Sequence, residues 1–197
     1  MNHAKIIREK MKNTGGIITA KDLRASHIPS VYLTRMVEKG KLIRADRGIY
    51  LDSTGDYDEY YFFQTKYSVA IFSYVSALFL HGLTDIIPNE LEVTVYKGYN
   101  PHRIKDKARI HYVTRNIYEL GLTESKTAFG NHVKVYDVER TICDMIKNRN
   151  KIEVELFSKT MHRYIQSPKK DLHKLYEYAS EMKVYQKVKD IIELVYV

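Results

Sequence analysis

The chain has 197 residues, a single cysteine and a formal net charge of +8, so it is long enough for one large domain or two small domains with buried cores. One cysteine excludes an internal disulfide and is typical of a protein in the reducing cytoplasm. The first helix is too polar for a secretory signal, and the most apolar stretch, residues 69–83, is shorter than the roughly 20 residues of a membrane span, so we expect a cytoplasmic protein that does not enter a membrane.

The N-terminal quarter of the chain is predicted to be a winged helix-turn-helix. Residues 4–11 form the first helix, and Thr19 is a natural N-cap for a second, short helix over residues 20–25. Pro29 belongs to the turn that follows, because its ring cannot enter a helix interior and it disfavours helical geometry in the preceding residue. The third helix of the motif therefore starts near Ser30.

The third helix and the hairpin after it complete this motif. Leu33, Met36 and Val37 recur at three- and four-residue spacing, which predicts that they form the buried face of the helix. Gly40 is suited to the left-handed position at the helix end. Residues 42–51 then alternate around a turn and predict a two-stranded hairpin, the wing.

The positive charge is concentrated in this segment. Residues 1–51 contain 11 Lys and Arg against 4 Asp and Glu, whereas the rest of the chain contains 21 against 20. Such asymmetry is expected of a segment that meets a phosphate backbone, so the predicted partner is double-stranded DNA. The residues expected to reach base edges in the major groove are Ser30, Tyr32, Thr34 and Arg35. Those expected to contact phosphate are Lys39, Lys41, Arg44 and Arg47.

A polar, turn-forming run at residues 52–56 predicts the domain boundary, which gives a DNA-binding domain over residues 1–55 and a second domain over 56–197. The second domain is expected to contain helices over 57–66 and 74–80, strands over 91–96, 110–113 and 132–136, and helices over 138–147, 152–166, 169–182 and 185–196. The fold class is therefore α+β: a winged helix-turn-helix followed by a mixed α/β domain with a small sheet and a helical C-terminus.

A second basic segment lies within the second domain. It carries five cations against one acid and contains loop-forming glycine, asparagine and proline. A solvated loop is one interpretation. The other is an auxiliary contact with the DNA backbone, made by Lys97, Arg103, Lys105, Lys107 and Arg109.

The sequence contains no convincing catalytic, metal or cofactor site, so we do not expect an enzyme. There is no glycine-rich phosphate loop, and the 8 histidines are scattered. A metal-dependent nuclease strand would need an acid two residues before Lys97, where Val95 stands. Cys143 lies on the apolar side of a helix and is predicted to be a core residue. Arg140 and Asp144 are four residues apart, which fits a structural ion pair, with a functional role as the alternative.

Four blocks of sequence together resemble the AbiEi antitoxins of type IV toxin-antitoxin systems. They are residues 16–23, the wing over residues 40–51, residues 76–83 and residues 135–144, and they follow one another in the order of that family. The blocks are spread over about the first three quarters of the chain. The helices after residue 151 carry no motif that can be matched.

This resemblance implies an antitoxin of an abortive phage infection module that represses its own operon. The winged helix would bind inverted repeats in the promoter, and the second domain would neutralise a neighbouring AbiEii-type nucleotidyltransferase toxin, with or without a stable complex. It implies no catalytic residue. The residues responsible for neutralisation, the operator sequence and the oligomeric state are left open.

The main rival is a winged-helix repressor whose second domain senses a small molecule. Its effector pocket would be expected beside the aromatic-rich helix at residues 57–67, which otherwise packs as part of the core. Stacking of these rings on single-stranded bases is a further alternative, although only Lys66 supplies a positive charge among them.

Overall fold

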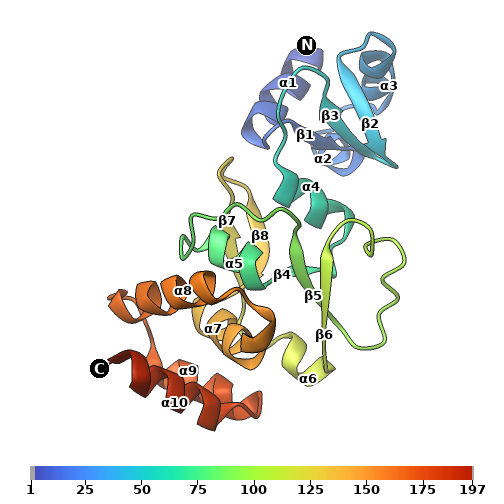
Figure 1. The fold of residues 1–197 in the computed structure, drawn as a ribbon. Helices are drawn as coiled ribbons and strands as arrows, with labels where there is room; N and C mark the ends of the chain where they lie inside the picture. Colours follow the sequence, from blue (N-terminus) through green and yellow to red (C-terminus); the bar gives the residue numbers. More distant parts are fainter. Residues whose placement is uncertain (1–2, 197) are drawn as a thin grey trace. The chain divides into compact units, whose positions relative to one another are not determined.

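The computed structural model describes residues 3–196 and shows the expected α+β architecture (Figure 1). The chain forms two compact units. Unit 1 is the chain up to Ser68 together with Lys126–Val133, and unit 2 is Val69–Ser125 together with the chain from Lys134 onward. Each unit is described separately below.

Unit 1 contains the winged helix-turn-helix. Its elements are α1 (His3–Asn13), β1 (Ile17–Thr19), α2 (Ala20–Ala25), α3 (Val31–Glu38), β2 (Leu42–Asp46) and β3 (Ile49–Asp52). The three strands form an antiparallel sheet in the order β1-β3-β2. Apolar side chains from the three helices and from β1 and β2 form one core, in which Ile7, Leu23 and Leu33 are fully buried.

The start of α2 follows the sequence expectation closely. The Thr19 hydroxyl accepts a hydrogen bond from the Asp22 amide at 3.1 Å, and the Asp22 carboxylate accepts one from the Thr19 amide at 2.8 Å. This reciprocal pair satisfies two otherwise unpaired amides of the first helical turn. At the other end of α2, His27 adopts a positive φ of 54°, and the chain turns there toward α3.

Unit 1 continues beyond the boundary expected after residue 55, because helix α4 (Glu59–Lys66) belongs to it. Tyr61 and Phe62 pack against a small core of Ile17, Ile49 and Leu51. Burying these faces of β1 and β3 ties α4 to the winged helix. The aromatic residues of this segment therefore contribute to packing, as the simpler interpretation of the sequence predicted.

Asp58 fastens three separate segments within unit 1. Its side chain is 1% exposed and caps α4 by accepting from the Tyr61 amide at 3.0 Å. It also accepts from the Thr127 hydroxyl at 2.5 Å and from the Asn131 amide group at 2.7 Å, while its own amide donates to the Gly15 carbonyl at 2.9 Å. Residues 126–133 are thereby attached to the winged helix although they follow it by many residues.

Unit 2 is built on a five-stranded mixed sheet in the order β6-β5-β4-β8-β7. Its strands are β4 (Ile71–Phe72), β5 (Glu92–Tyr96), β6 (Arg109–Val113), β7 (Leu122–Lys126) and β8 (His132–Tyr136), with the hairpin between the last two entering unit 1. β5 runs parallel to β6 and antiparallel to β4, which pairs in parallel with β8. The sequence did not predict β4 or β7.

The helices of unit 2 share one hydrophobic core. They are α5 (Tyr74–Leu80), α7 (Val138–Lys147), α8 (Val154–Gln166), α9 (Leu172–Glu181) and α10 (Tyr185–Tyr196), together with the short α6 (Arg115–Tyr118) and a 3₁₀ turn at Arg149–Lys151. α7 is the central element, because every residue from Glu139 to Ile146 is buried and the helix contacts α5, α9 and α10. Within residues 3–196 no helix has the length and apolarity required to cross a membrane.

The charged residues of α7 are part of this packing. Arg140 is 0% exposed and pairs with Asp144, with 3.1 Å between Nε and Oδ2. Its Nη1 also donates to the Ile117 and Leu120 carbonyls, each at 2.7 Å. The pair therefore fixes the turn after α6 onto α7, in agreement with the structural interpretation of this motif.

Candidate nucleic-acid interface

Helix α3 separates a buried face from an exposed one. Leu33 and Met36 are buried in the core of the winged helix, as their spacing predicted. Thr34 and Arg35 lie on the opposite, exposed face, and Ser30 is exposed at the N-terminal end. The Ser30 side chain makes no capping hydrogen bond, so its hydroxyl is available for an external partner.

Tyr32 differs from its neighbours because it is only half-exposed. Its ring lies 4.6 Å from the ring of His3, and the guanidinium carbon of Arg35 lies 5.8 Å from the Tyr32 centroid. Tyr32 therefore connects α1 to α3 and provides an aromatic face beside Arg35. Its hydroxyl remains a candidate for base contact, but part of its role is to support Arg35.

The wing presents its cations on an irregular hairpin. Arg44 of β2 pairs with Tyr50 of β3, and the register shifts between Arg44 and Asp46. At the tip the Arg47 amide donates to the Asp46 carboxylate at 2.6 Å, which stabilises the turn. The side chains of Arg44 and Arg47 are both exposed.

The acid at the tip of the wing is neutralised from within unit 1. Lys66 of α4 lies 2.7 Å from Asp46, and both side chains are about three quarters buried. The hydrogen bond with Asp46 raises the pKa of Lys66. This ion pair offsets the negative charge of Asp46, so the fully exposed charged side chains of the wing are the cations Lys41, Arg44 and Arg47.

The four predicted phosphate contacts are available for a ligand. Lys39, Lys41, Arg44 and Arg47 are all exposed, and within the described residues 3–196 none of them forms an ion pair. They follow one another from the end of α3 to the tip of the wing. The structure thus brings the predicted base contacts and phosphate contacts into one continuous part of unit 1, while DNA contact by each residue stays a prediction.

Two apolar residues on the same unit were not among the candidates. Val31 is 46% exposed at the start of α3, and Ile43 is 53% exposed on β2. Val31 precedes Thr34 and Arg35 by three and four residues, so helical periodicity could have placed it on the outer face. An exposed aliphatic side chain there can contact the methyl group of thymine.

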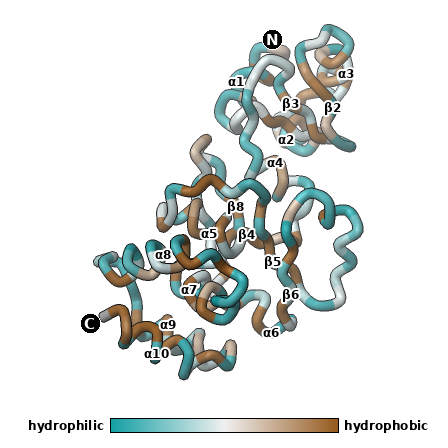
Figure 2. Tube along the Cα trace, in the orientation of Figure 1, coloured by the Kyte–Doolittle hydropathy of each residue, from teal (hydrophilic) through white to brown (hydrophobic). Residues whose placement is uncertain are grey.

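The auxiliary basic segment between β5 and β6 is an ordered loop. Ile104 and Ala108 are 0% and 2% exposed and anchor it, while the surrounding residues are mostly hydrophilic (Figure 2). All five of its predicted contact residues, Lys97, Arg103, Lys105, Lys107 and Arg109, are exposed. Arg109 differs from the other four, because its guanidinium approaches the carboxylates of Glu90 and Glu92, each at 3.6 Å.

A metal site was not expected from the sequence, whereas the rival interpretation requires an effector pocket. The described part of the chain contains no group of three or more His, Cys, Asp and Glu side chains arranged to hold a metal ion. The rival interpretation placed a pocket beside residues 57–67. A cavity of about 720 Å³ lies in unit 2 instead, and none of its lining residues comes from that helix.

Cys143 is a core residue, as the sequence indicated. It is 0% exposed, and burial raises the pKa of its thiol to about 12. A thiol that stays protonated at neutral pH is a poor nucleophile. This side chain therefore adds no reactive centre to unit 2.

Comparison with known proteins supports a regulator. The family described as "Transcriptional regulator, AbiEi antitoxin" matches residues 6–51, which cover α1 through most of β3, so the resemblance is confirmed for this segment. No curated protein matches the chain. The crystal structure of the RV2827C protein from Mycobacterium tuberculosis has a similar fold, with a TM-score of 0.64 and 10% identity over 96% of this chain and 76% of that one. The winged helix-turn-helix of this chain thus matches a family of transcriptional regulators.

Proposed function

We propose that the protein is an autoregulatory antitoxin that binds inverted repeats in its own promoter through the winged helix. α3 enters the major groove, where Ser30, Thr34 and Arg35 reach base edges. The wing lies along the phosphate backbone. The observation that carries this proposal is the row of exposed cations without ion pairs from Lys39 to Arg47.

The physical argument separates the two kinds of contact. A cation on a phosphate releases condensed counterions, so each such contact adds about 0.9 to the slope of log affinity against log salt. A bidentate arginine on a guanine edge instead discriminates against a wrong base by about 1–3 kcal/mol. The wing residues should show the first behaviour and Arg35 should show the second.

These expectations can be tested by fluorescence anisotropy with a duplex taken from the chain's own promoter. Arg47→Ala should weaken binding to all sequences alike and lower the salt slope by about 1. Arg35→Ala should cost about 1–3 kcal/mol on the operator and relax specificity at one base pair. Lys187→Ala, at an exposed position on α10, is the matched control and should change neither quantity. An unchanged salt slope for Arg47→Ala would refute the assignment of the wing.

The antitoxin half of the proposal rests on the resemblance and assigns neutralisation of a nucleotidyltransferase toxin to the part of the chain after the winged helix. No residue is assigned to that activity. The loop from Lys97 to Lys107 is proposed as an additional backbone contact, together with Arg109, whose exposed guanidinium makes only long contacts with Glu90 and Glu92.

The division of labour is best tested in the full-length chain, because α4 packs on the winged helix and truncation at residue 56 would expose its apolar face. The double variant Arg35→Ala/Arg47→Ala should still protect cells that express the neighbouring toxin, while repression of a promoter fusion is lost. Loss of both activities in a folded variant would show that neutralisation needs the DNA-binding surface. Absence of a neighbouring nucleotidyltransferase gene would favour a small-molecule-sensing repressor.

A further inference from the structure

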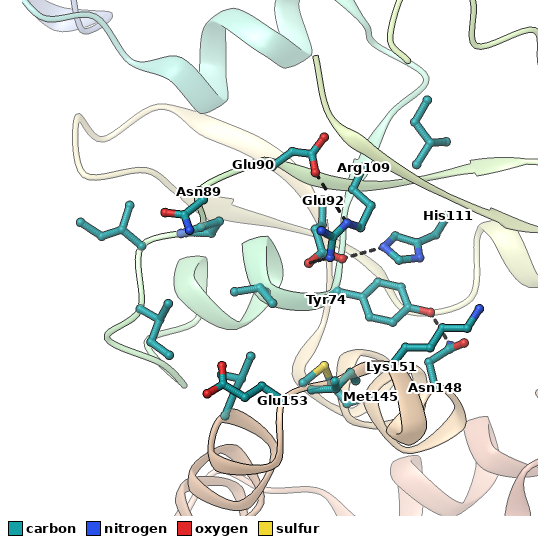
Figure 3. Close-up of a pocket in the computed structure, with 17 residues that line it drawn as sticks. Tyr74, Asn89, Glu90, Glu92, Arg109, His111, Met145, Asn148, Lys151 and Glu153 are labelled. Atoms are coloured by element: carbon teal, nitrogen blue, oxygen red, sulfur yellow. Dashed lines mark hydrogen bonds and ion pairs between the residues drawn. The ribbon is translucent and has the colours of Figure 1, made fainter. Parts of the chain in front are cut away.

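The cavity in unit 2 is large enough for a small molecule. It has a volume of about 720 Å³, within the range of typical ligand pockets. Its lining comes from α5, the chain before and within β5, strand β6, and the segment from the end of α7 into α8 (Figure 3). Every lining residue belongs to unit 2.

The deepest charged group in the cavity is the carboxylate of Glu92. Its side chain is 10% exposed, and its Oε2 lies 2.7 Å from Nε2 of His111. Its Oε1 lies 3.6 Å from Nη1 of Arg109, whose side chain is 61% exposed. His111 engages one oxygen of the carboxylate, and the long, solvated ion pair with Arg109 engages the other only weakly, so the carboxylate keeps lone pairs that can accept from a further donor. Glu92 therefore favours a further cation inside the cavity.

A rigid floor holds this carboxylate in place. Tyr74 has a positive φ of 48°, which is unfavourable for a bulky residue and is kept by its surroundings. Its hydroxyl accepts a hydrogen bond from the Asn148 side chain at 2.6 Å. Its ring stacks on His111 with 3.8 Å between centroids and 23° between planes. His111 is thus fixed between Tyr74 and Glu92, as Figure 3 shows.

The charges at the rim add to the preference set by Glu92. The cavity lining contains three carboxylates, those of Glu90, Glu92 and Glu153, against the cations Arg109 and Lys151 and the imidazole of His111. Glu153 has no ion-pair partner within residues 3–196. In a chain with a net charge of +8, a lining with an excess of acids is a local reversal of sign. Glu90, Glu153, Arg109 and Lys151 are all exposed, so water and salt weaken the charges of both signs at the rim, and the buried Glu92 dominates the preference.

The remaining wall is apolar. Val75, Met145, Ile152 and Leu156 line it from the helices and the turn between them. Two isoleucines before β5, Ile86 and Ile87, are 49% and 72% exposed. Exposed aliphatic residues beside a cavity would be covered by a ligand with an apolar body.

We propose that unit 2 binds a small organic amine, with its ammonium group on Glu92 and its apolar body against Ile86, Ile87 and Leu156. Glu153 adds attraction at the rim, and Tyr74 with His111 positions the carboxylate. The site lies wholly in unit 2, so it does not depend on DNA binding by the winged helix.

The charge preference can be tested on the full-length protein with three probes of one shape. Hexylammonium, 1-hexanol and hexanoate are titrated separately, and binding is followed by changes in the tyrosine and histidine NMR signals. Hexylammonium should bind at least about thirtyfold more tightly than 1-hexanol, as a largely desolvated charge pair would produce. Hexanoate should not bind measurably.

Variants then locate the bound ammonium group. Glu92→Gln should reduce hexylammonium affinity to that of 1-hexanol. Glu153→Gln, at an exposed rim position that folding does not require, should weaken it about two- to fivefold. Ile87→Ser should weaken hexylammonium and 1-hexanol alike by about three- to tenfold, because both lose the same alkyl contact. Glu193→Gln, on the exposed side of α10, is the matched control and should have no effect.

Two results would overturn the proposal. Equal affinity for the three probes would show that the cavity selects by apolar contact alone. Tighter binding of hexanoate, lost in Arg109→Gln, would show that the rim cations set the preference. Normal operator binding in either case would leave the proposed DNA-binding function intact.

Discussion

Replacing Arg140 with methionine should strongly destabilise unit 2, because the arginine is fully buried and holds three groups. Its removal leaves the buried carboxylate of Asp144 without a partner, which costs about 3–5 kcal/mol. The carbonyls of Ile117 and Leu120 also lose their donor, at about 1–3 kcal/mol for each group that stays dry. Since domains are stable by only about 5–15 kcal/mol, Arg140→Met should bring unit 2 close to unfolding.

A double variant separates the ion pair from the other contacts. Arg140→Met/Asp144→Leu removes both charges together, so it should regain the cost of the unpaired carboxylate. It should still be about 2–6 kcal/mol less stable than the wild type, because the two carbonyls remain without a donor. Urea unfolding followed by circular dichroism measures both variants. Lys159→Met, which breaks an exposed pair with Glu155 on α8, is the control and should change stability by less than about 0.5 kcal/mol.

The loss of stability caused by Arg140→Met should also depend on pH. Burial raises the pKa of Asp144 even beside Arg140, and loss of the arginine raises it further. A carboxyl whose pKa is higher in the folded state is favoured when it is protonated, so the destabilisation by Arg140→Met should be smaller at pH 5 than at pH 8. A loss below about 1 kcal/mol at both pH values would refute the structural role and favour a functional one for this motif.

Three further outcomes are expected. Asp58→Ala should lower the stability of unit 1 by about 3–5 kcal/mol in urea unfolding, because the three donors that the buried carboxylate satisfies lose their acceptor. Asp56→Ala, at an exposed neighbouring position, is the control and should leave the stability unchanged. Cys143 should not react with a thiol reagent at pH 8 until the protein is unfolded in guanidinium, and rapid reaction of the native chain would contradict its burial. Val31→Ser should weaken operator binding about fivefold without changing stability by more than about 0.5 kcal/mol, and equal operator affinity would remove this residue from the proposed interface.

The winged helix could be predicted because local signals determine it. Caps, helical periodicity and a hairpin turn lie next to one another in the sequence, and the Thr19 cap and the buried Leu33 and Met36 appear as expected. Unit 2 was harder to predict. β4 has two residues, too few for a periodic pattern, and both of them are buried. The strand β7 contains mostly polar residues, so its alternation was hidden.

The candidate sites could likewise be predicted only where local sequence patterns determine them. Exposure of the cations on α3 and the wing followed from helical and strand periodicity. By contrast, the ion pair between Asp46 and Lys66 joins the wing to a helix beyond the expected boundary. The two residues are 20 positions apart in the sequence, so no local pattern predicts their contact. The cavity around Glu92 is assembled from α5, β5, β6 and α8, so its existence depends on tertiary packing alone.

The attachment of residues 126–133 to Asp58 has a consequence for synthesis of the protein. The winged helix and α4 emerge from the ribosome first, but Asp58 then lacks the Thr127 and Asn131 side chains that satisfy its carboxylate. At about 5–20 residues per second, these partners follow several seconds later. During that interval the nascent winged helix would be only marginally stable, and its final stability would be reached only after much of the sheet of unit 2 had been translated.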